Sequence, residues 1–228
     1  MRCGEIMKKI FLITLLFLTV STFSIQWLEF SNEVNTDVLY GSISFPVFFD
    51  INNFAVEKFI NETIYNDIHS FLRETYQMSL DTKRIAKETD STLRKSNIFI
   101  AFKVFNFKNY LSIVIDYSRY TGGAHGITTR KAYNFDFQNG IQLKLSDLIS
   151  NNTRKKIIEK INKVIENNKQ RYFDKKIEYL SQEQFYLSKE GLIIFFQQYE
   201  IAPFASGIPE FKFNYTEIEF LPDVSDDF

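Results

Sequence analysis

One β-rich block in the middle of the chain most constrains the fold, because its apolar residues alternate with the two-residue period of strands. Residues 98–105 form the first alternating run, Lys108-Asn109 forms a tight turn, and residues 111–117 form the returning run. A third run at residues 130–137 ends in Asn139-Gly140, a dipeptide typical of hairpin turns. The block therefore predicts three antiparallel strands in meander order.

Two further segments, one on each side of this block, carry apolar residues at helical spacing. The apolar positions are Val56, Ile60, Ile64, Ile68 and Leu72 in the first segment, and Ile157, Ile158, Ile161, Val164 and Ile165 in the second. Each stripe predicts a helix with one buried face, the first over about residues 53–76. The candidate N-terminal caps are Asp50, Asn52 or Asn53 for the first helix and Asn152 or Thr153 for the second.

The remaining segments supply further strands. Residues 38–49 are extended, and Pro46 confines them to a sheet edge or a strand end. A polar stretch at residues 79–95 has no strong period and is predicted to be a loop or a short ribbon. The expected strands of the C-terminal third, of which the first two form a hairpin, cover residues 185–187, 192–199 and 211–215.

The order of strand, helix, strands, helix and strands predicts an α+β fold. We expect two subdomains of antiparallel sheet, each with one main helix packed on it. The N-terminal subdomain covers residues 36–138 and the C-terminal subdomain covers residues 140–221. An acidic tail follows at residues 222–228.

The first 24 residues have the order of a secretory signal peptide. Lys8 and Lys9 precede the apolar run Ile10–Val20, and small polar residues follow, so we expect cleavage near Ser21–Ser24. Extended to Leu28, the same stretch approaches the ~20 residues that span a bilayer, so an uncleaved anchor is the alternative. Either way the chain is expected to be exported, to the periplasm or the extracellular space. A membrane contact is expected only through an uncleaved leader.

Composition excludes several classes of partner and cofactor. Lys and Arg total 27 against 28 Asp and Glu, so the chain has no global positive field to hold nucleic acid. The one cysteine, Cys3, precedes the apolar run, so a processed chain forms no disulfide. The sequence has neither a Walker loop nor a dinucleotide-binding glycine motif, and we expect no cofactor.

The inventory of catalytic side chains is small. The two histidines, His69 and His125, lie far apart, and no His-x-x-x-His spacing typical of zinc hydrolases occurs. There is no Gly-x-Ser-x-Gly elbow. We therefore expect no metal site and no catalytic residues. The alternative is a glycan hydrolase in which Glu200 acts with His125 or Asp116.

The first candidate ligand-binding segment lies between two predicted strands and contains Tyr120, Gly122, Gly123 and His125. The glycines could bring backbone N–H groups close to a ligand, with His125 as hydrogen-bond donor or base. The alternative is a strand connection that needs positive φ angles. The rings of Tyr120 and the nearby Tyr117 would suit stacking on a sugar if they are exposed.

The second candidate segment joins two predicted strands at residues 199–209 and contains Tyr199, Glu200 and Pro203. Glu200 directly follows a Phe-rich strand and could face a cleft. Alternatively, Glu200 and Tyr199 hold this loop by hydrogen bonds to its backbone. Whether the two candidate segments meet in space decides whether they form one site.

Several motifs together resemble a known bacterial module. They are Thr121–Gly126, the Asn139-Gly140 turn, Leu145–Leu148 before a helix, Glu190–Leu192, and the loop Tyr199–Phe211. Over about residues 36–221 the chain resembles the DUF4163 plus DUF3298 domain pair. This pair occurs in the ectodomain of RsiV-type lysozyme-sensing anti-sigma factors and ahead of the catalytic domain in PdaC-type peptidoglycan deacetylases. The resemblance implies an envelope location and a recognition role.

The resemblance and the missing catalytic inventory lead to one expected function. We expect a stand-alone, non-catalytic binding module of the bacterial cell envelope. Its expected partner is an envelope protein, such as a lysozyme, or a peptidoglycan-derived glycan. A structural or assembly role is a further alternative. The stand-alone form is expected because at most nine residues precede the apolar run of the leader and the chain ends at Phe228.

Overall fold

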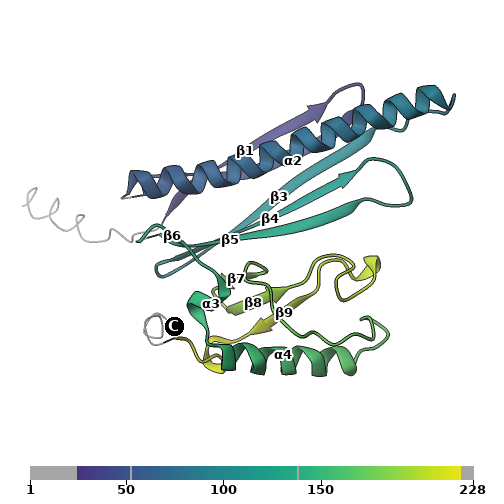
Figure 1. The fold of residues 1–228 in the computed structure, drawn as a ribbon. Helices are drawn as coiled ribbons and strands as arrows, with labels where there is room; N and C mark the ends of the chain where they lie inside the picture. The colour runs from purple at the N-terminus through teal and green to yellow at the C-terminus, as the bar shows by residue number, and fades with distance from the viewer. Residues whose placement is uncertain (1–24, 52, 138, 222–228) are drawn as a thin grey trace, which may run out of the picture.

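Four layers of secondary structure stack in the order helix, sheet, sheet, helix in the computed structural model (Figure 1). The structure describes residues 25–51, 53–137 and 139–221. The predicted leader, the candidate cap Asn52 and the predicted acidic tail lie outside the described residues. The α+β class with one main helix on each sheet is confirmed.

The first two layers are helix α2 and a six-stranded sheet of order β1-β2-β3-β4-β5-β6. The element bounds are β1 Gln26–Asn35, β2 Leu39–Phe49, α2 Phe54–Glu88, β3 Ser96–Phe107, β4 Tyr110–Tyr120, β5 Ile127–Asp136 and β6 Ile141–Gln142. The predicted meander is confirmed as β3-β4-β5, with turns at Lys108-Asn109 and Asn139-Gly140. The predicted boundary between subdomains falls in the second of these turns, and β6 still pairs with β5.

One pair in the larger sheet departs from the predicted antiparallel arrangement. Strands β2 and β3 are parallel, because the long helix α2 between them forms the crossover that parallel neighbours require. Within β2, only the residues Leu39–Ile43 pair with β3. Pro46 therefore lies where β2 has a neighbour on one side, β1, as expected for a proline in a strand.

Strand β1 was not predicted, because its residues show no one-sided apolar alternation. It lies at the edge of the sheet and is exposed along almost its whole length, including the large apolar side chains of Trp27, Leu28 and Phe30.

In the described part of the chain, no helix is both long and apolar enough to cross a membrane.

Helix α2 continues to Glu88, so the predicted loop or ribbon at residues 79–95 is wrong over most of its length. The inward stripe continues as Thr75, Ser79 and Ala86, all buried, rather than as large apolar residues. The Ser79 Oγ donates to the Thr75 carbonyl at 2.7 Å, so this buried hydroxyl is satisfied inside the helix. At the other end, the Asn53 side chain caps the helix, as predicted.

The second pair of layers is a three-stranded antiparallel sheet, β7-β8-β9, and helix α4. The element bounds are α3 Leu145–Leu148, α4 Asn151–Glu166, β7 Phe185–Ser188, β8 Gly191–Phe195, β9 Glu210–Phe213, and the short 3₁₀ helices η1 Phe204–Ser206 and η2 Tyr215–Glu217. The cap of α4 is Ser150, whose Oγ accepts from the Thr153 N–H at 3.1 Å, and not the predicted Asn152 or Thr153. Strand β8 ends four residues before its predicted end at Tyr199.

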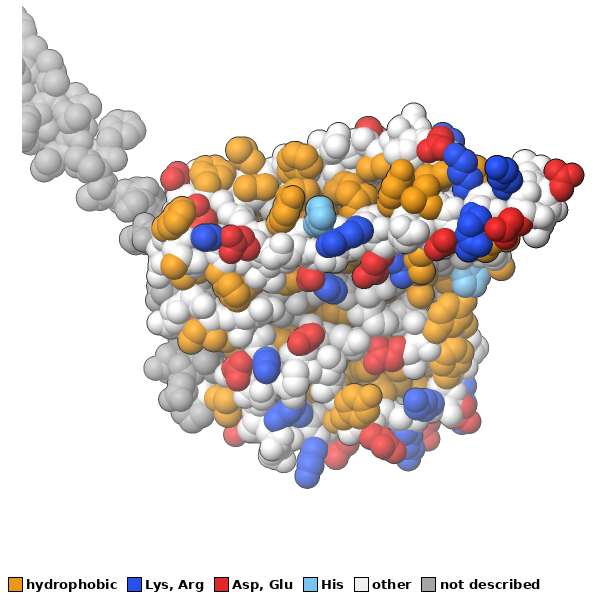
Figure 2. Space-filling view, turned by 45° about the horizontal axis from the view of Figure 1, so that its top comes forward, with side chains coloured by type: hydrophobic (Ala, Val, Ile, Leu, Met, Phe, Trp, Pro, Cys, Tyr) orange, Lys and Arg blue, Asp and Glu red, His pale blue; other side chains and the backbone are white. Residues whose placement is uncertain are grey.

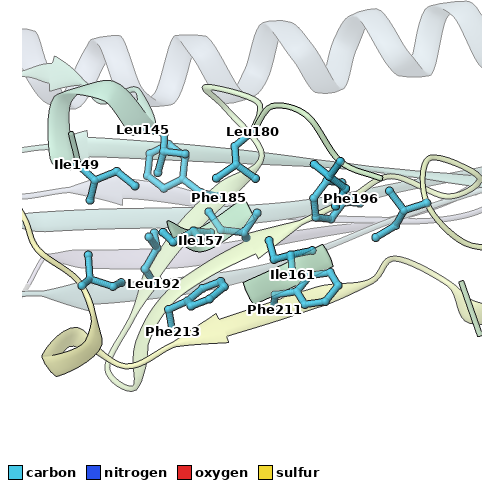
Figure 3. Close-up of a cluster of buried hydrophobic side chains, with 14 of the residues drawn as sticks. Leu145, Ile149, Ile157, Ile161, Leu180, Phe185, Leu192, Phe196, Phe211 and Phe213 are labelled. Atoms are coloured by element: carbon cyan, nitrogen blue, oxygen red, sulfur yellow. The ribbon is translucent and has the colours of Figure 1, made fainter. Parts of the chain in front are cut away.

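Each helix seals its own apolar core. Between α4 and the smaller sheet, buried side chains from both elements pack together (Figure 3), and they include Ile157, Ile161, Phe185 and Phe213. Between α2 and the larger sheet, Ile60, Ile64 and Ile68 pack with apolar residues of β2 to β5. The outer surface along α2 carries apolar side chains with charged ones between them (Figure 2).

The two sheets also pack directly on one another. A third apolar cluster joins Val114 and Ala132 of the larger sheet to Tyr186, Ile193 and Phe195 of the smaller one. Buried polar groups are paired across this interface: the Asn134 amide donates to the Phe185 carbonyl at 2.8 Å, and the Leu187 N–H donates to Ser112 Oγ at 3.0 Å. Strands β4 and β5 thus present one face to α2 and the other to the smaller sheet. The smaller sheet and α4, with the segments that join them, are called the second domain below.

Candidate functional site

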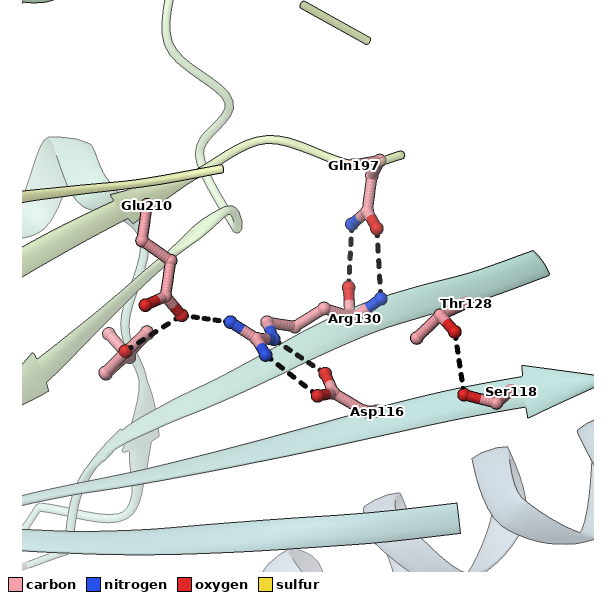
Figure 4. Close-up of polar contacts among 7 residues, drawn as sticks. Asp116, Ser118, Thr128, Arg130, Gln197 and Glu210 are labelled. Atoms are coloured by element: carbon pink, nitrogen blue, oxygen red, sulfur yellow. Dashed lines mark hydrogen bonds and ion pairs between the residues drawn. The ribbon is translucent and has the colours of Figure 1, made fainter. Parts of the chain in front are cut away.

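The second domain covers only part of the length of β4 and β5. The closed end, Tyr110–Asp116 of β4 with Arg130–Asp136 of β5, lies under the smaller sheet. The open end, Ser118–Tyr120 of β4 with Ile127–Thr128 of β5, extends past it to the candidate loops. Figure 4 shows Asp116, Ser118, Thr128 and Arg130 pointing from both strands toward the second domain.

Arg130 ties the two domains together at the closed end. Its Nε and Nη2 donate to the two carboxylate oxygens of Asp116 at 2.6 and 2.8 Å, and Nη1 pairs with Glu210 of β9. Burial opposes the charge of Arg130, but the hydrogen bonds and charge of Asp116, with that of Glu210, hold its pKa above its usual range. The carboxylate of Asp116 is therefore committed to a structural ion pair.

Two glutamines after β8 bind the free edge of β5. The Gln197 side chain accepts from the Arg130 N–H at 3.0 Å and donates to the Arg130 carbonyl at 2.7 Å, and Gln198 Oε1 accepts from the Thr128 N–H at 2.7 Å. These contacts place the loop after β8 beside the loop after β4. Sequence reasoning missed them, because a Gln-Gln pair has no motif that predicts its partner.

The two candidate loops meet. His125 Nε2 and the Tyr199 hydroxyl lie 2.7 Å apart, and the His125 ring stacks on Phe204 with centroids 4.1 Å apart. Tyr199 adopts a left-handed φ of 66°, which is uncommon for a residue other than glycine. The Tyr199 ring also lies near Phe204, with centroids 6.1 Å apart, so both loops hold Phe204 in place.

Tyr120 links the first loop to the segment before β3. Its hydroxyl donates to the Gly123 carbonyl at 2.9 Å and accepts from Arg94 Nη1 at 3.3 Å. Gly122 and Gly123 have φ angles of 116° and 97°, so these two glycines serve the turn that needs positive φ. Tyr117, in contrast, is buried against Phe71 on the α2 side, so it does not meet the condition of exposure that sugar stacking required.

Glu200 and Pro203 shape the second loop rather than face the first. The Glu200 carboxylate accepts from the Gln197 N–H at 2.7 Å and from Gln184 Nε2 at 3.2 Å, so it pins its own loop. Pro203 precedes η1, the short turn that carries Phe204. The described side-chain contacts of Glu200 are thus with glutamines, whereas those of Asp116 are with Arg130.

A groove of about 420 Å³ lies at the open end, on the face of the larger sheet that points toward the second domain. Residues of the three adjacent strands β3, β4 and β5 line it together with residues of both candidate loops. The lining includes Arg94, Asn97, Ser118, Tyr120, Thr128 and Phe204. Asn97 lies directly across from Tyr120 in the sheet, and Ser118 Oγ lies 2.8 Å from Thr128 Oγ1. Of the predicted ligand residues, Tyr120 lines the groove, while His125 and Tyr199 support its wall.

The groove offers aromatic, hydroxyl and amide groups and the guanidinium of Arg94. Among the residues that the structure describes, no group of three or more His, Cys, Asp or Glu side chains is arranged to hold a metal ion. The arrangement suits recognition of a polar ligand with an apolar face.

Each part of the chain matches a known protein family. Residues 32–128 match the family described as Deacetylase PdaC, and residues 145–216 match a protein family of unknown function, DUF3298. These matches are consistent with a module of PdaC/DUF3298 type and confirm the resemblance drawn from the motifs.

A relative in sequence supports this assignment. It is the peptidoglycan-N-acetylmuramic acid deacetylase PdaC of Bacillus subtilis strain 168, 29% identical over 124 residues. The match covers 51% of this chain and 26% of that protein, so it spans about a quarter of the length of the relative.

Two crystal structures share the fold. A DUF3298 family member from Bacteroides fragilis NCTC 9343 has a TM-score of 0.73 at 19% identity, covering 90% of this chain and 97% of the other. A DUF3298 family protein from Pseudomonas aeruginosa PAO1 has a TM-score of 0.55 at 17% identity, covering 88% and 95%. At these identities the likeness concerns the fold alone.

Proposed function

We propose that this chain is an exported, non-catalytic binding module of the bacterial cell envelope, and that its groove holds a peptidoglycan-derived glycan. The observation that carries the proposal is the groove itself. Tyr120 and Phe204 offer aromatic surfaces for the C–H face of a sugar ring, and Asn97, Ser118 and Thr128 offer hydrogen-bonding groups for its hydroxyl and acetamido groups. The name of the Bacillus relative, a deacetylase of peptidoglycan, supports this ligand class.

A catalytic function has weaker support. The three groups considered for a hydrolase, Asp116, His125 and Glu200, each bind a protein partner: Arg130, Tyr199 and Gln197. Glycoside hydrolysis needs two carboxyl groups that flank one sugar bond. The described contacts of Asp116 and Glu200 instead hold the domain interface and a loop.

Isothermal titration with soluble peptidoglycan fragments tests the proposal. We expect Tyr120→Ala and Phe204→Ala each to weaken binding about twofold to tenfold, since each removes one aromatic contact of about 0.5–1.5 kcal/mol. Tyr179→Ala is the matched control, because Tyr179 is an aromatic residue of the second domain that is 77% exposed and lies outside the groove. Wild-type protein that binds no fragment, or binding that both groove variants leave unchanged, would overturn the proposal.

A protein partner, such as a lysozyme, is the second candidate. Strand β1 favours it, because an exposed edge strand with Leu28 and Phe30 on its surface is typical of surfaces that bind another chain. Leu28→Asp should then abolish capture of lysozyme by the purified protein without lowering its thermal midpoint. Capture that Leu28→Asp leaves intact would remove this candidate.

A further inference from the structure

Arg94 lies at the rim of the groove, in the segment just before β3. Its Nη1 donates a hydrogen bond to the Tyr120 hydroxyl at 3.3 Å, and this hydroxyl in turn donates a hydrogen bond to the Gly123 carbonyl. Both partners are neutral, so neither compensates the charge of the guanidinium. Among the described residues, no Asp or Glu side chain forms an ion pair with Arg94.

The other cations near this end of the molecule are engaged elsewhere. Arg119 adjoins the groove, but its guanidinium lies over the Phe71 ring and 3.5 Å from Glu74, on the α2 side of the sheet. Lys95 donates to the Thr36 carbonyl at 2.6 Å. Among the described residues that line the groove, Arg94 is thus the cation left without a carboxylate partner, and no Asp or Glu is present, so the local charge is positive although the whole chain is near neutral.

We propose that the groove selects glycans that carry a carboxylate, and that Arg94 binds this carboxylate. The inference rests on the proposed function and names the ligand class more narrowly. A guanidinium offers two parallel N–H donors that match the two oxygens of a carboxylate. With a sugar ring on Tyr120 and its polar substituents at Asn97, an acidic substituent would reach the rim, where Arg94 stands. The lactyl ether of N-acetylmuramic acid is a substituent of this kind.

Two disaccharides that differ in this substituent give a direct test by isothermal titration. One is N-acetylglucosaminyl-N-acetylmuramic acid with a free lactyl carboxylate, and the other is N,N′-diacetylchitobiose, which lacks the lactyl group. We expect the wild-type protein to prefer the acidic disaccharide by about fivefold or more, because a hydrogen-bonded charge pair forms only with it. The preference should shrink as ionic strength rises.

Three variants complete the test. Arg94→Gln should remove the preference, so that the two disaccharides bind with similar affinity, and Arg94→Lys should keep part of it, because a point charge remains without the planar fork. Arg73→Gln is the control for net charge, since Arg73 is an exposed arginine of α2 outside the groove.

The outcomes separate this inference from the proposed function. If both disaccharides bind equally to the wild type and Tyr120→Ala weakens both, glycan binding stands and the role of Arg94 is overturned. If neither disaccharide binds, the proposed function and this inference both fail. A preference that Arg94→Gln retains also overturns the assignment to Arg94.

Discussion

The closed and open ends of β4 and β5 belong to the same two strands but treat their polar groups differently. At the closed end, the Arg130 guanidinium pairs with Asp116 and Glu210 and lies over the Phe195 ring. Little of its hydrogen-bonding capacity is left for a ligand. At the open end, Arg94 and the hydroxyl pair of Ser118 and Thr128 face a groove instead of another layer. Polar groups that are buried and saturated build a scaffold, whereas exposed ones with spare capacity can meet a ligand.

The packing between the two sheets at the closed end also determines where the loop after β8 lies at the open end. The apolar cluster of Val114, Ala132 and Phe195 fixes the distance between the sheets at the closed end. That fixed distance then sets where the loop after β8 can reach, and Gln197 and Gln198 attach it to β5. The closed end therefore positions the groove without lining it.

The largest expected effect comes from breaking the closed end with Phe195→Ala. Phe195 is 1% exposed and packs between the sheets, so its removal should lower the free energy of unfolding by about 3–5 kcal/mol. Urea denaturation measures this. Phe173→Ala, at a half-exposed phenylalanine, is the control and should cost less than about 1 kcal/mol. Equal losses for the two variants would show that the sheets are not packed as described.

Arg130→Met should have the next largest effect. The substitution keeps much of the side-chain volume but leaves Asp116 and Glu210 without their cation. Since both carboxylates are partly solvated, we expect a loss of about 2–4 kcal/mol, at the low end for a broken buried pair. Adding Asp116→Leu should restore part of this loss, because it removes the uncompensated charge. A double variant less stable than Arg130→Met alone would contradict this role.

Gln197→Ala tests whether the closed end positions the groove. The change removes two hydrogen bonds to Arg130, and should lower unfolding free energy by about 1–2 kcal/mol. Because the loop that carries Phe204 is attached through these contacts, glycan affinity should fall as well, although Gln197 lies outside the groove. The exposed Gln170 supplies the control, Gln170→Ala, which should change neither quantity. If glycan affinity is unchanged in Gln197→Ala, the contacts at the closed end do not position the groove.

The smallest expected effect is the response of stability to acid. Hydrogen bonds and charge from Lys212 lower the pKa of Glu190, and those from Lys160, with Asn214, lower the pKa of Glu217. A lowered folded-state pKa stabilises the protein above the ordinary value of 4.5, and this contribution is lost as pH falls through the folded-state pKa. As the pH is lowered from above 4.5 through the folded-state pKa, the thermal midpoint should drop less in Lys160→Met and Lys212→Met than in the wild type. Identical slopes would show that these exposed pairs contribute nothing.

Much of the scaffold followed from residue patterns. The alternation over residues 98–137 and the stripe from Val56 to Leu72 predicted the meander and the start of α2, because each pattern repeats with the period of its element. The parallel pair and β1 did not follow. Parallel pairing depends on where a crossover returns, and an edge strand exposed on both faces has no apolar period to detect.

The site followed from the sequence only in part. Glycine and histidine in the loop after β4, and proline and glycine in the loop after β8, marked the two segments that meet through His125 and Tyr199. Phe204 and Arg94 were missed, since one aromatic residue in an aromatic-rich chain and one arginine in a polar stretch carry no distinguishing signal. Their roles depend on distances between segments far apart in the chain, which no local pattern encodes.

The most direct measurement is an amide NMR titration of the ¹⁵N-labelled protein with a peptidoglycan disaccharide. The open end should respond: amide shifts should move at residues 94–97, 118–128 and 199–204, and saturate together as ligand is added. The closed end, around Ser112 and Asn134, should stay unchanged, because it lies under the second domain. Shifts confined to α2, to β1 or to α4, or no shifts at millimolar ligand, would contradict a glycan site at the open end.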